Sequence, residues 1–533
     1  MKYAKWIALF LAVAVFVAVC CLIDYEALIG EVGARLVTPF SEMAYERPAV
    51  EQMETDLANC RIEAQSGTDK DALMEQVWKV YNFYNTFYTQ YNLASIYYFK
   101  DMTDTSWEAE YSYCARNAAS VDAMLEEMFY ALADSPLKEQ LEQDEAFGEG
   151  FFDSYSGESV WDETFLALME QEAVLEEEYY DVTLQYQDLE SYSDPAFDAC
   201  AADLAEVFVE LVKVRQEMAE YVGYENYADF AYDFYHYRDY TPRQAESYLK
   251  QIQKELVPLY RQVESRGGAE NAEEFCRPAE AYAYVESAAQ AMGGVVGNAF
   301  KVLREAELYD ITYSDKKYDG SFEVYLPDYA APYVFIDPAT TQQDKLTFAH
   351  EFGHFCNDFA SWGSVVGVDV AEVFSQGLEY LSLCYGDEAG TLTEMKMVDC
   401  LRIYVEQAAY ATFEQEVYRL EDPTVESVFA LYEEISISFG FDSWDWEPKG
   451  FVLIGHFYTD PLYIISYVVS NDAAFQLYQM EQEEPGTGLA LFEQELATEQ
   501  TYFLSFVEEA GLESPFAPGR VEKVRQLLES VLA

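Results

Sequence analysis

His350 and His354 lie four residues apart in the segment His350-Glu351-Phe352-Gly353-His354, and they are two of only four histidines in 533 residues. A helix advances about 100° per residue, so both imidazoles lie within about 40° of each other and can bind one ion. Glu351 projects from the same turn, where its carboxylate can deprotonate a water bound to the metal without being a ligand. The alternative is an ordinary surface helix with a chance match, which we expect in on the order of a few chains per thousand at this histidine content. The spacing therefore predicts a zinc-dependent hydrolytic site.

Glu372 is the candidate third ligand, because catalytic zinc sites typically take three protein ligands and leave the fourth position open. It lies in the run Asp369–Glu379, whose apolar residues are typical of a buried helix. Gly363 and Gly367 separate this run from the histidine pair, and they allow the chain to reverse and bring Glu372 to the metal. Glu379 is either an acceptor that orients a ligand imidazole or a solvated or helix-pairing carboxylate.

A second group of candidates could stabilise the charge that develops during the reaction: His456, Tyr463 and Tyr467. Attack on a peptide carbonyl builds negative charge on the oxygen, which requires preorganised hydrogen-bond donors. The chain has 45 tyrosines, so ordinary packing is the alternative for either tyrosine. The other isolated histidine, His236, stands between two tyrosines and is typical of a core or surface position.

Three blocks of the sequence resemble the thimet oligopeptidase and oligoendopeptidase F family of zinc peptidases. They are the end of the histidine helix (Thr347–His354), the run Val370–Gln376, and the histidine-and-tyrosine segment Gly455–Tyr467. Weaker similarity is found in Gly223–Tyr227 and Asp239–Pro242. The resemblance covers roughly residues 75 to 515 and is specific in the three blocks.

This resemblance implies a deep channel between lobes that admits short, unstructured peptides and excludes folded proteins. It also implies that His350, His354 and Glu372 hold one zinc ion per chain. The family often carries a further tyrosine where this chain has Ile465, so the sequence leaves open whether Tyr463 or Tyr467 polarises the carbonyl.

Length and charge limit the possible partners. A chain of 533 residues needs more than one core, and 51% hydrophobic residues indicate that it folds. With 98 acidic and 31 basic residues the net charge is -67, which argues against nucleic acid or an anionic lipid surface as a partner. The oligomeric state is left open.

The amino terminus predicts export. Two lysines precede the uninterrupted apolar run Trp6–Ile23, and acidic residues follow it. This pattern is typical of a signal peptide or of an uncleaved membrane anchor, with the rest of the chain outside the cytoplasm. Export would permit a disulfide such as Cys60–Cys114, although the seven cysteines beyond this run are widely spaced and contain no C-x-x-C motif.

Residue periodicity predicts a mainly helical, two-lobed fold. Apolar residues recur three and four positions apart from residue 45 to about 265, while 322–326 and 333–336 are typical of short strands. We therefore predict a signal or anchor over 1–23, a helical lobe over 24–220 and a catalytic lobe over 221–533. The small sheet precedes the zinc helix, where its edge either binds a substrate backbone or only supports the helix.

Together these features predict a zinc metalloendopeptidase that acts on short peptides outside the cytoplasm. Glu351 would deprotonate the zinc-bound water, and His456 with Tyr463 or Tyr467 would stabilise the oxyanion. Two alternatives remain: a zinc exopeptidase that trims dipeptides, and a membrane-tethered protein of the same fold that binds peptides without turnover.

Overall fold

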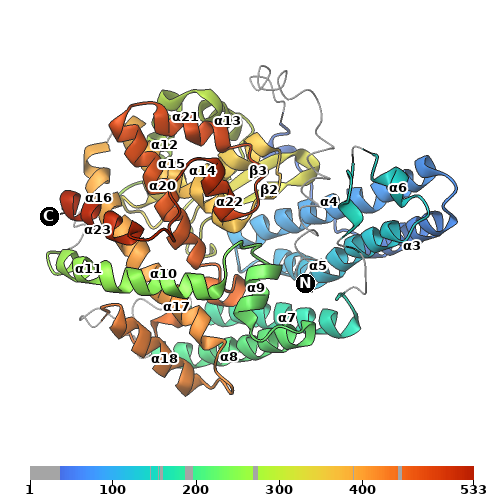
Figure 1. Ribbon diagram of the computed structural model, residues 1–533, viewed down its shortest axis with the longest axis horizontal. Helices are drawn as coiled ribbons and strands as arrows, with labels where there is room; N and C mark the ends of the chain where they lie inside the picture. Colours follow the sequence, from blue (N-terminus) through green and yellow to red (C-terminus); the bar gives the residue numbers. More distant parts are fainter. Residues whose placement is uncertain are drawn as a thin grey trace.

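The computed structural model describes residues 37–144, 146–153, 155, 160–186, 196–267, 274–387, 389–441 and 447–532. The chain is mainly helical with one three-stranded sheet, as predicted (Figure 1). The predicted signal or anchor over residues 1–23 lies outside the described residues. Within the described ranges, none of the helices is both long enough and apolar enough to cross a membrane.

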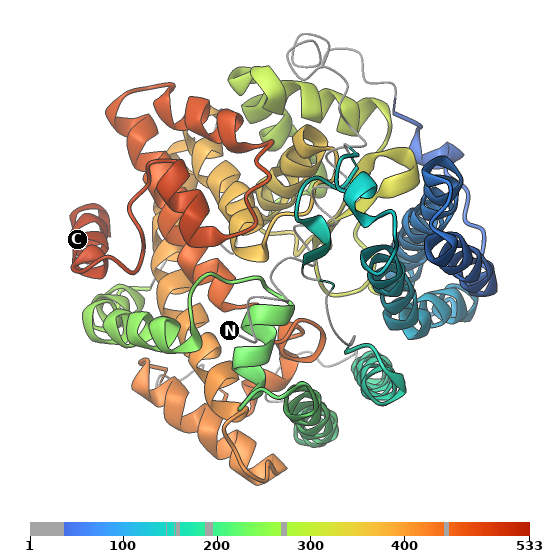
Figure 2. The same cartoon turned by 45° about the vertical axis from the view of Figure 1, so that its right-hand side comes forward.

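The first three long helices are α3 (Val50–Ser66), α4 (Lys70–Lys100) and α5 (Thr105–Ala133). They lie together on one side of the molecule in both Figure 1 and Figure 2. Asp69 and Asp104 cap α4 and α5 by accepting backbone N–H groups of the first turn. These helices form a hydrophobic cluster of their own, while the last turns of α4 pack into the larger cluster of the molecule.

Two more helices of the predicted helical lobe, α7 (Glu163–Gln185) and α8 (Phe197–Val222), pack against each other. Their buried side chains belong to the larger hydrophobic cluster, together with the elements that carry the candidate site. The division between the smaller and the larger hydrophobic cluster therefore falls within residues 24–220. The predicted lobe boundary at residue 220 stays a prediction.

The sheet has the strand order β1-β3-β2, with β1 (Tyr309–Asp310) parallel and β2 (Phe322–Leu326) antiparallel to β3 (Ala331–Phe335). All five residues of β3 are buried, which explains the continuous apolar run that predicted it. The strands β2 and β3 both pack against α14 (Asp344–Ser361), the helix of the histidine pair. The sheet thus packs against α14, and β2 lies at an edge of the sheet.

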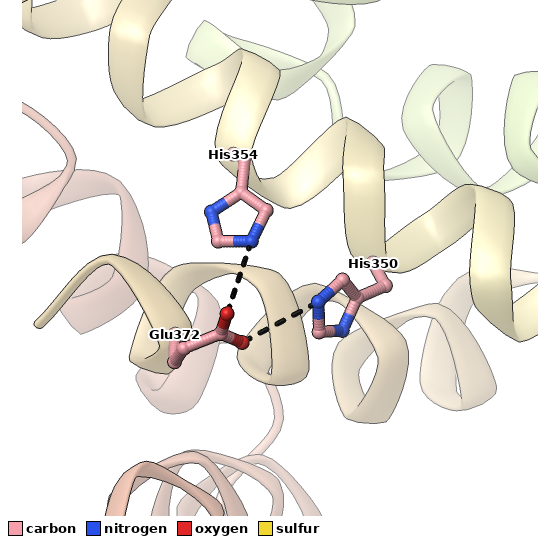
Figure 3. Close-up of side chains that lie close together, drawn as sticks. All are labelled: His350, His354 and Glu372. Carbon is pink, nitrogen blue, oxygen red and sulfur yellow. Dashed lines mark ion pairs between the residues drawn. The ribbon is translucent and has the colours of Figure 1, made fainter. Parts of the chain in front are cut away.

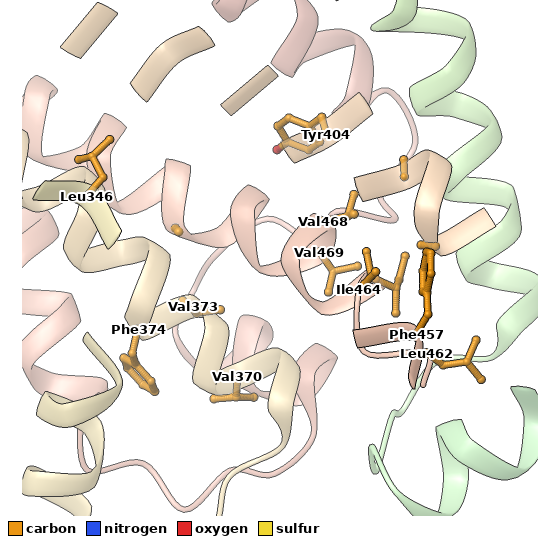
Figure 4. Close-up of a cluster of buried hydrophobic side chains, with 14 of the residues drawn as sticks. Leu346, Val370, Val373, Phe374, Tyr404, Phe457, Leu462, Ile464, Val468 and Val469 are labelled. Carbon is orange, nitrogen blue, oxygen red and sulfur yellow. The ribbon is translucent and has the colours of Figure 1, made fainter. Parts of the chain in front are cut away.

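The helices α14, α15 (Val368–Tyr385) and α20 (Ile465–Glu483) pack together at the centre. Their apolar faces contribute to the buried cluster in Figure 4, with Val370, Val373 and Phe374 from α15 and Val468 and Val469 from α20. The chain reverses between α14 and α15 through left-handed backbone at Trp362 and Gly363, with φ of 59° and 72°. One of the two predicted glycines therefore makes the turn.

The other predicted glycine, Gly367, serves close packing instead. Its φ is -62°, and a Cβ placed on it would lie 2.1 Å from the carbonyl oxygen of Thr501.

The remaining elements are η3 (Phe40–Glu42), α6 (Lys138–Leu141), η4 (Phe151–Asp153), α9 (Tyr227–Phe234), α10 (Pro242–Glu255), α11 (Val257–Glu264), α12 (Pro278–Met292), α13 (Gly294–Glu305), η5 (Pro327–Tyr329), α16 (Ala389–Arg402), a π-helical turn (Ile403–Gln407), α17 (Ala408–Val417), α18 (Val425–Ser438), η7 (Gly450–Leu453), α19 (His456–Thr459), α21 (Thr487–Glu495), α22 (Phe503–Glu509) and α23 (Arg520–Leu532).

The seven cysteines of the described chain are all free thiols. Cys60 and Cys114, whose pairing export would permit, are both buried and unlinked in this structure. Packing of the first three helices therefore does not depend on a disulfide between them.

Candidate metal centre and active site

The structure brings His350, His354 and Glu372 together, with the imidazoles on α14 and the carboxylate on α15 (Figure 3). His350 Nε2 lies 3.4 Å from Glu372 Oε2, and His354 Nε2 lies 3.6 Å from Glu372 Oε1. Zinc bonds of about 2.0–2.1 Å in tetrahedral geometry place ligand atoms about 3.4 Å apart. The three side chains therefore fit one zinc ion, and no other such group of three was found among the described residues.

The charges around this group favour a bound cation. Burial alone would lower the pKa of His350, but the carboxylates of Glu372 and Glu379 outweigh burial and raise that pKa to about 9. Burial would raise the pKa of Glu372, but His350 and His354 outweigh it and lower that pKa to about 2. The carboxylates around His350 thus make this point electrically negative, and a divalent cation would be stabilised by the same charges.

Glu351 follows His350 on α14 and is buried, with an exposed fraction of 6%. Burial raises the pKa of its carboxyl, although His350 and His354 act in the opposite direction. A carboxylate with a raised pKa is a better proton acceptor near neutral pH. Its position and its pKa both suit the role of general base.

Glu379 orients one of the two imidazoles. Its Oε1 accepts a hydrogen bond of 2.8 Å from His350 Nδ1, which leaves Nε2 of the ring for the metal. Its Oε2 accepts a bond of 2.6 Å from Lys396, which also donates to Asp399. Glu379 is therefore not a solvated carboxylate, because it accepts from the imidazole and also pairs α15 with α16 through Lys396. Lys396 was not foreseen, because a single lysine in a helix gives no sequence signal.

The predicted donors also lie at this site. Tyr463 donates a hydrogen bond of 2.5 Å to Glu372 Oε1, and Tyr467 shares one of 2.9 Å with His456 Nε2. The Tyr467 ring lies 6.3 Å from the His350 ring, measured between centroids. Burial raises the pKa of both tyrosines well above the usual value, so both hydroxyls keep their protons at neutral pH.

His236 has a more specific place than the sequence indicated. It is buried, and its Nε2 lies 2.8 Å from the carbonyl oxygen of Pro461, two residues before Tyr463. Arg238, which the sequence did not single out, is buried beside it and bonds the carbonyl oxygen of Leu462. Neither contact has a sequence signal, since more than 200 positions separate the partners.

Comparisons with known proteins concern the fold and the amino-terminal part of the chain. The Peptidase M3 N-terminal domain family matches residues 40–158. No curated protein sequence matches the chain significantly. Similar solved structures include a protein assigned as oligoendopeptidase F (TM-score 0.79, 21% identity, 93% of this chain and 98% of that one), PZ peptidase A with an inhibitor (0.79, 20%, 92% and 99%), and a protein from Bacillus anthracis assigned as oligoendopeptidase F (0.77, 18%, 93% and 98%).

At these identities the solved structures establish the fold, and the family match covers the amino-terminal part of the chain. The resemblance predicted from the three sequence blocks is confirmed on these grounds. The roles of the individual site residues stay predictions.

Proposed function

We propose that this chain is a zinc-dependent oligopeptidase that cleaves short, unstructured peptides at internal bonds. The observation that carries the proposal is the placement of two imidazoles and one carboxylate at zinc-ligand separations, next to a buried glutamate and a histidine–tyrosine pair. The similarity to oligoendopeptidase F structures and the Peptidase M3 N-terminal domain support a peptidase.

His350, His354 and Glu372 would hold the metal ion. When bound, zinc polarises a carbonyl oxygen and lowers the pKa of a water molecule. Glu351 would accept the proton of the attacking water and pass it to the nitrogen of the leaving amine, so that the new carboxylate and the free amine separate. As the water attacks, the tyrosine hydroxyls and His456 would stabilise the negative charge that develops on the carbonyl oxygen.

Of the two tyrosines, we assign this charge-stabilising role first to Tyr467. Its hydroxyl forms a hydrogen bond with His456, whereas the hydroxyl of Tyr463 is engaged by Glu372. A hydroxyl that is not bonded to a ligand carboxylate can turn its proton toward the carbonyl oxygen, with His456 beside it. Tyr463 would then mainly hold the ligand carboxylate.

We further propose that the chain acts outside the cytoplasm, on the grounds of the apolar run Trp6–Ile23 and its basic flank. The net charge of -67 would repel anionic surfaces, so the partners would be free peptides, and contact with a membrane would be limited to this segment.

The test compares wild-type protein, Glu351→Gln and a control variant on quenched peptides of defined length. Glu351→Gln should still bind one zinc ion per chain and lose about 10²–10⁴-fold in turnover, the range that general-base catalysis supplies. The control is Glu481→Gln, a buried glutamate on α20 that accepts backbone N–H groups of Gly486 and Leu489. Turnover retained by Glu351→Gln, or no turnover in the wild type, would exclude the proposal.

Mass analysis of the products from a ten-residue peptide decides between cleavage modes. Internal fragments are expected. Release of terminal dipeptides alone would show an exopeptidase instead.

A further inference from the structure

The loop between α19 and α20, residues 460–464, is held in a conformation that its own residues do not favour. Leu462 has a φ of 63°, in the left-handed region. This region is sterically strained for a residue other than glycine. The loop carries Tyr463 and is followed on α20 by Tyr467, so its conformation sets the positions of both hydroxyls.

Three buried side chains from distant parts of the chain satisfy the backbone of this loop. His236 Nε2 lies 2.8 Å from the carbonyl oxygen of Pro461, and Arg238 Nη1 donates a bond of 2.9 Å to the carbonyl oxygen of Leu462. Glu414 Oε1 accepts the N–H of Leu462 at 2.6 Å. Because Pro461 and Leu462 are buried, each of these polar groups would otherwise lack a partner.

Arg238 also bonds the two helices that carry site residues. Its Nε lies 3.3 Å from both carboxylate oxygens of Asp369, which is three residues before Glu372 on α15. Its Nη2 donates a bond of 2.9 Å to Ser466, the residue before Tyr467 on α20. The side chain of Arg238 has no exposed surface, and 3% of the Asp369 side chain is exposed. One guanidinium thus joins α15, the loop and α20.

The same three elements meet again at the metal site. Tyr463 of the loop bonds Glu372 of α15 at 2.5 Å, and the ring of Tyr467 on α20 lies 5.4 Å from the Tyr463 ring, measured between centroids. We infer that Arg238 is a positioning residue for the proposed peptidase reaction. It fixes the hydroxyls of Tyr463 and Tyr467 relative to the ligand Glu372, and so sets the geometry that stabilises the oxyanion without touching the substrate. This inference rests on the proposed function.

A guanidinium suits this role because it is planar and presents five donors in fixed directions. Lysine keeps the charge beside Asp369 but cannot direct donors at Asp369, the Leu462 carbonyl and Ser466 at once. Arg238→Lys should therefore preserve the ion pair and loosen the loop. A misplacement of about 1 Å at an active site costs about 10²-fold in rate.

The experiment measures kcat, KM, zinc content and the inhibition constant of a phosphinic peptide for wild type and Arg238→Lys. We expect kcat to fall about 10–100-fold. KM should change little and zinc should stay at one ion per chain. The inhibition constant of the phosphinic peptide should rise in proportion to the loss of kcat/KM, because its tetrahedral oxygens test the same donors.

Arg520→Lys is the matched control. Arg520 is an equally buried arginine, its Nε lies 2.9 Å from both oxygens of Asp472 on α20, and its Nη1 bonds Glu513. It should lose comparable stability and keep kcat within about twofold of wild type, the range for a residue remote from the chemistry. Equal losses of kcat in the two variants would show that Arg238 is only structural.

Ser466→Ala decides the question if Arg238→Lys does not fold, because it removes the hydrogen bonds of Ser466 with the guanidinium and with Asp369, at 2.9 Å and 2.5 Å, and leaves the ion pair between Arg238 and Asp369. It should lower kcat selectively by at least about 3–10-fold, the value of one hydrogen bond. An unchanged kcat would overturn the inference. Absence of turnover in the wild type would contradict the proposed function instead, and the phosphinic-peptide affinities of the variants would then decide the role of Arg238 alone.

Discussion

Gly353 lies between the two histidines on α14, at the point where α15 crosses closest. A Cβ placed on it would lie 2.4 Å from the carbonyl oxygen of Phe374 and 2.5 Å from the Cα of Ser375. Both are backbone atoms of α15, so neither can swing aside as a flexible side chain would. In Gly353→Ala the two helices must move apart.

The distances give the size of the effect. An ordinary contact needs about 3.4 Å, so α15 has to shift by about 1 Å relative to α14. Overpacking of this kind typically costs about 1–3 kcal/mol, and the better helix propensity of alanine returns about 1 kcal/mol. The net loss of unfolding free energy should be about 0–2 kcal/mol.

The larger consequence concerns the metal. The separations of 3.4 Å and 3.6 Å between Glu372 and the imidazoles would widen, because Glu372 moves with α15. Zinc sites tolerate deviations of about 0.2 Å in ligand distance. We expect zinc affinity to fall by about 10–100-fold, as when residues that orient metal ligands are replaced.

The assay is a zinc competition titration with a chromophoric chelator, paired with urea unfolding of the metal-free protein. Gly297→Ala on α13 is the control, since its Cβ would meet only the carbonyl oxygen of Ala289, at 3.2 Å. It should bind zinc like the wild type. If Gly353→Ala also binds zinc with wild-type affinity, the close helix crossing is not what places Glu372 at the metal.

Three further outcomes are expected. Lys396→Met should lose about 3–5 kcal/mol of stability and bind zinc about 10–100-fold more weakly, because Glu379 is left buried without its cation. Lys317→Met, which removes a buried lysine from Asp310 and leaves Asp310 its second partner Lys100, should lose less stability and leave zinc affinity unchanged in the same titration. Burial raises the pKa of Glu414 to about 8 in the folded state. Below the unfolded pKa of about 4.3, Glu414 is protonated in both states and does not lower the stability. Between that pH and about pH 8, the unfolding free energy falls by about 1.4 kcal/mol per pH unit, because only the unfolded chain loses this proton. Glu414→Gln should remove this slope in urea unfolding at pH 5, 6 and 7. Zinc at 100 times its Kd should add about 2.7 kcal/mol to the unfolding free energy, and a chelator should abolish this gain.

The parts of the site that the sequence predicted are those fixed by local geometry. The i, i+4 spacing of His350 and His354 places them on one face of a helix whatever surrounds it. The approach of Glu372 followed from a helix, a turn and a second helix, and the structure makes the turn at Gly363. Strands 322–326 and 333–336 followed from alternation and an apolar run, and β2 and β3 lie there.

The parts that escaped prediction depend on contacts between distant positions. Arg238 bonds Asp369, which is 131 positions away, and Leu462, which is 224 positions away. Lys396 lies on a different helix from its partner Glu379, and neither spacing nor hydrophobic periodicity relates the two. A fully buried lysine or arginine needs a buried carboxylate as its partner. The chain has 98 acidic residues against 31 basic ones, and the sequence does not identify which acidic residue is that partner.

The carboxylate of Glu372 connects the two halves of the proposed chemistry. Its Oε1 accepts the Tyr463 hydroxyl and its Oε2 accepts the Ser375 hydroxyl, while each oxygen also lies near one imidazole. A change at Glu372 therefore alters the metal site and the tyrosine loop together, and its kinetic effect cannot be assigned to either. Variants of Glu351 and Arg238 test the two halves separately. Glu351 is not a metal ligand, and Arg238 acts on the tyrosine loop. A loss of turnover at constant zinc content in both variants would place proton transfer and oxyanion geometry on different residues of one rigid site.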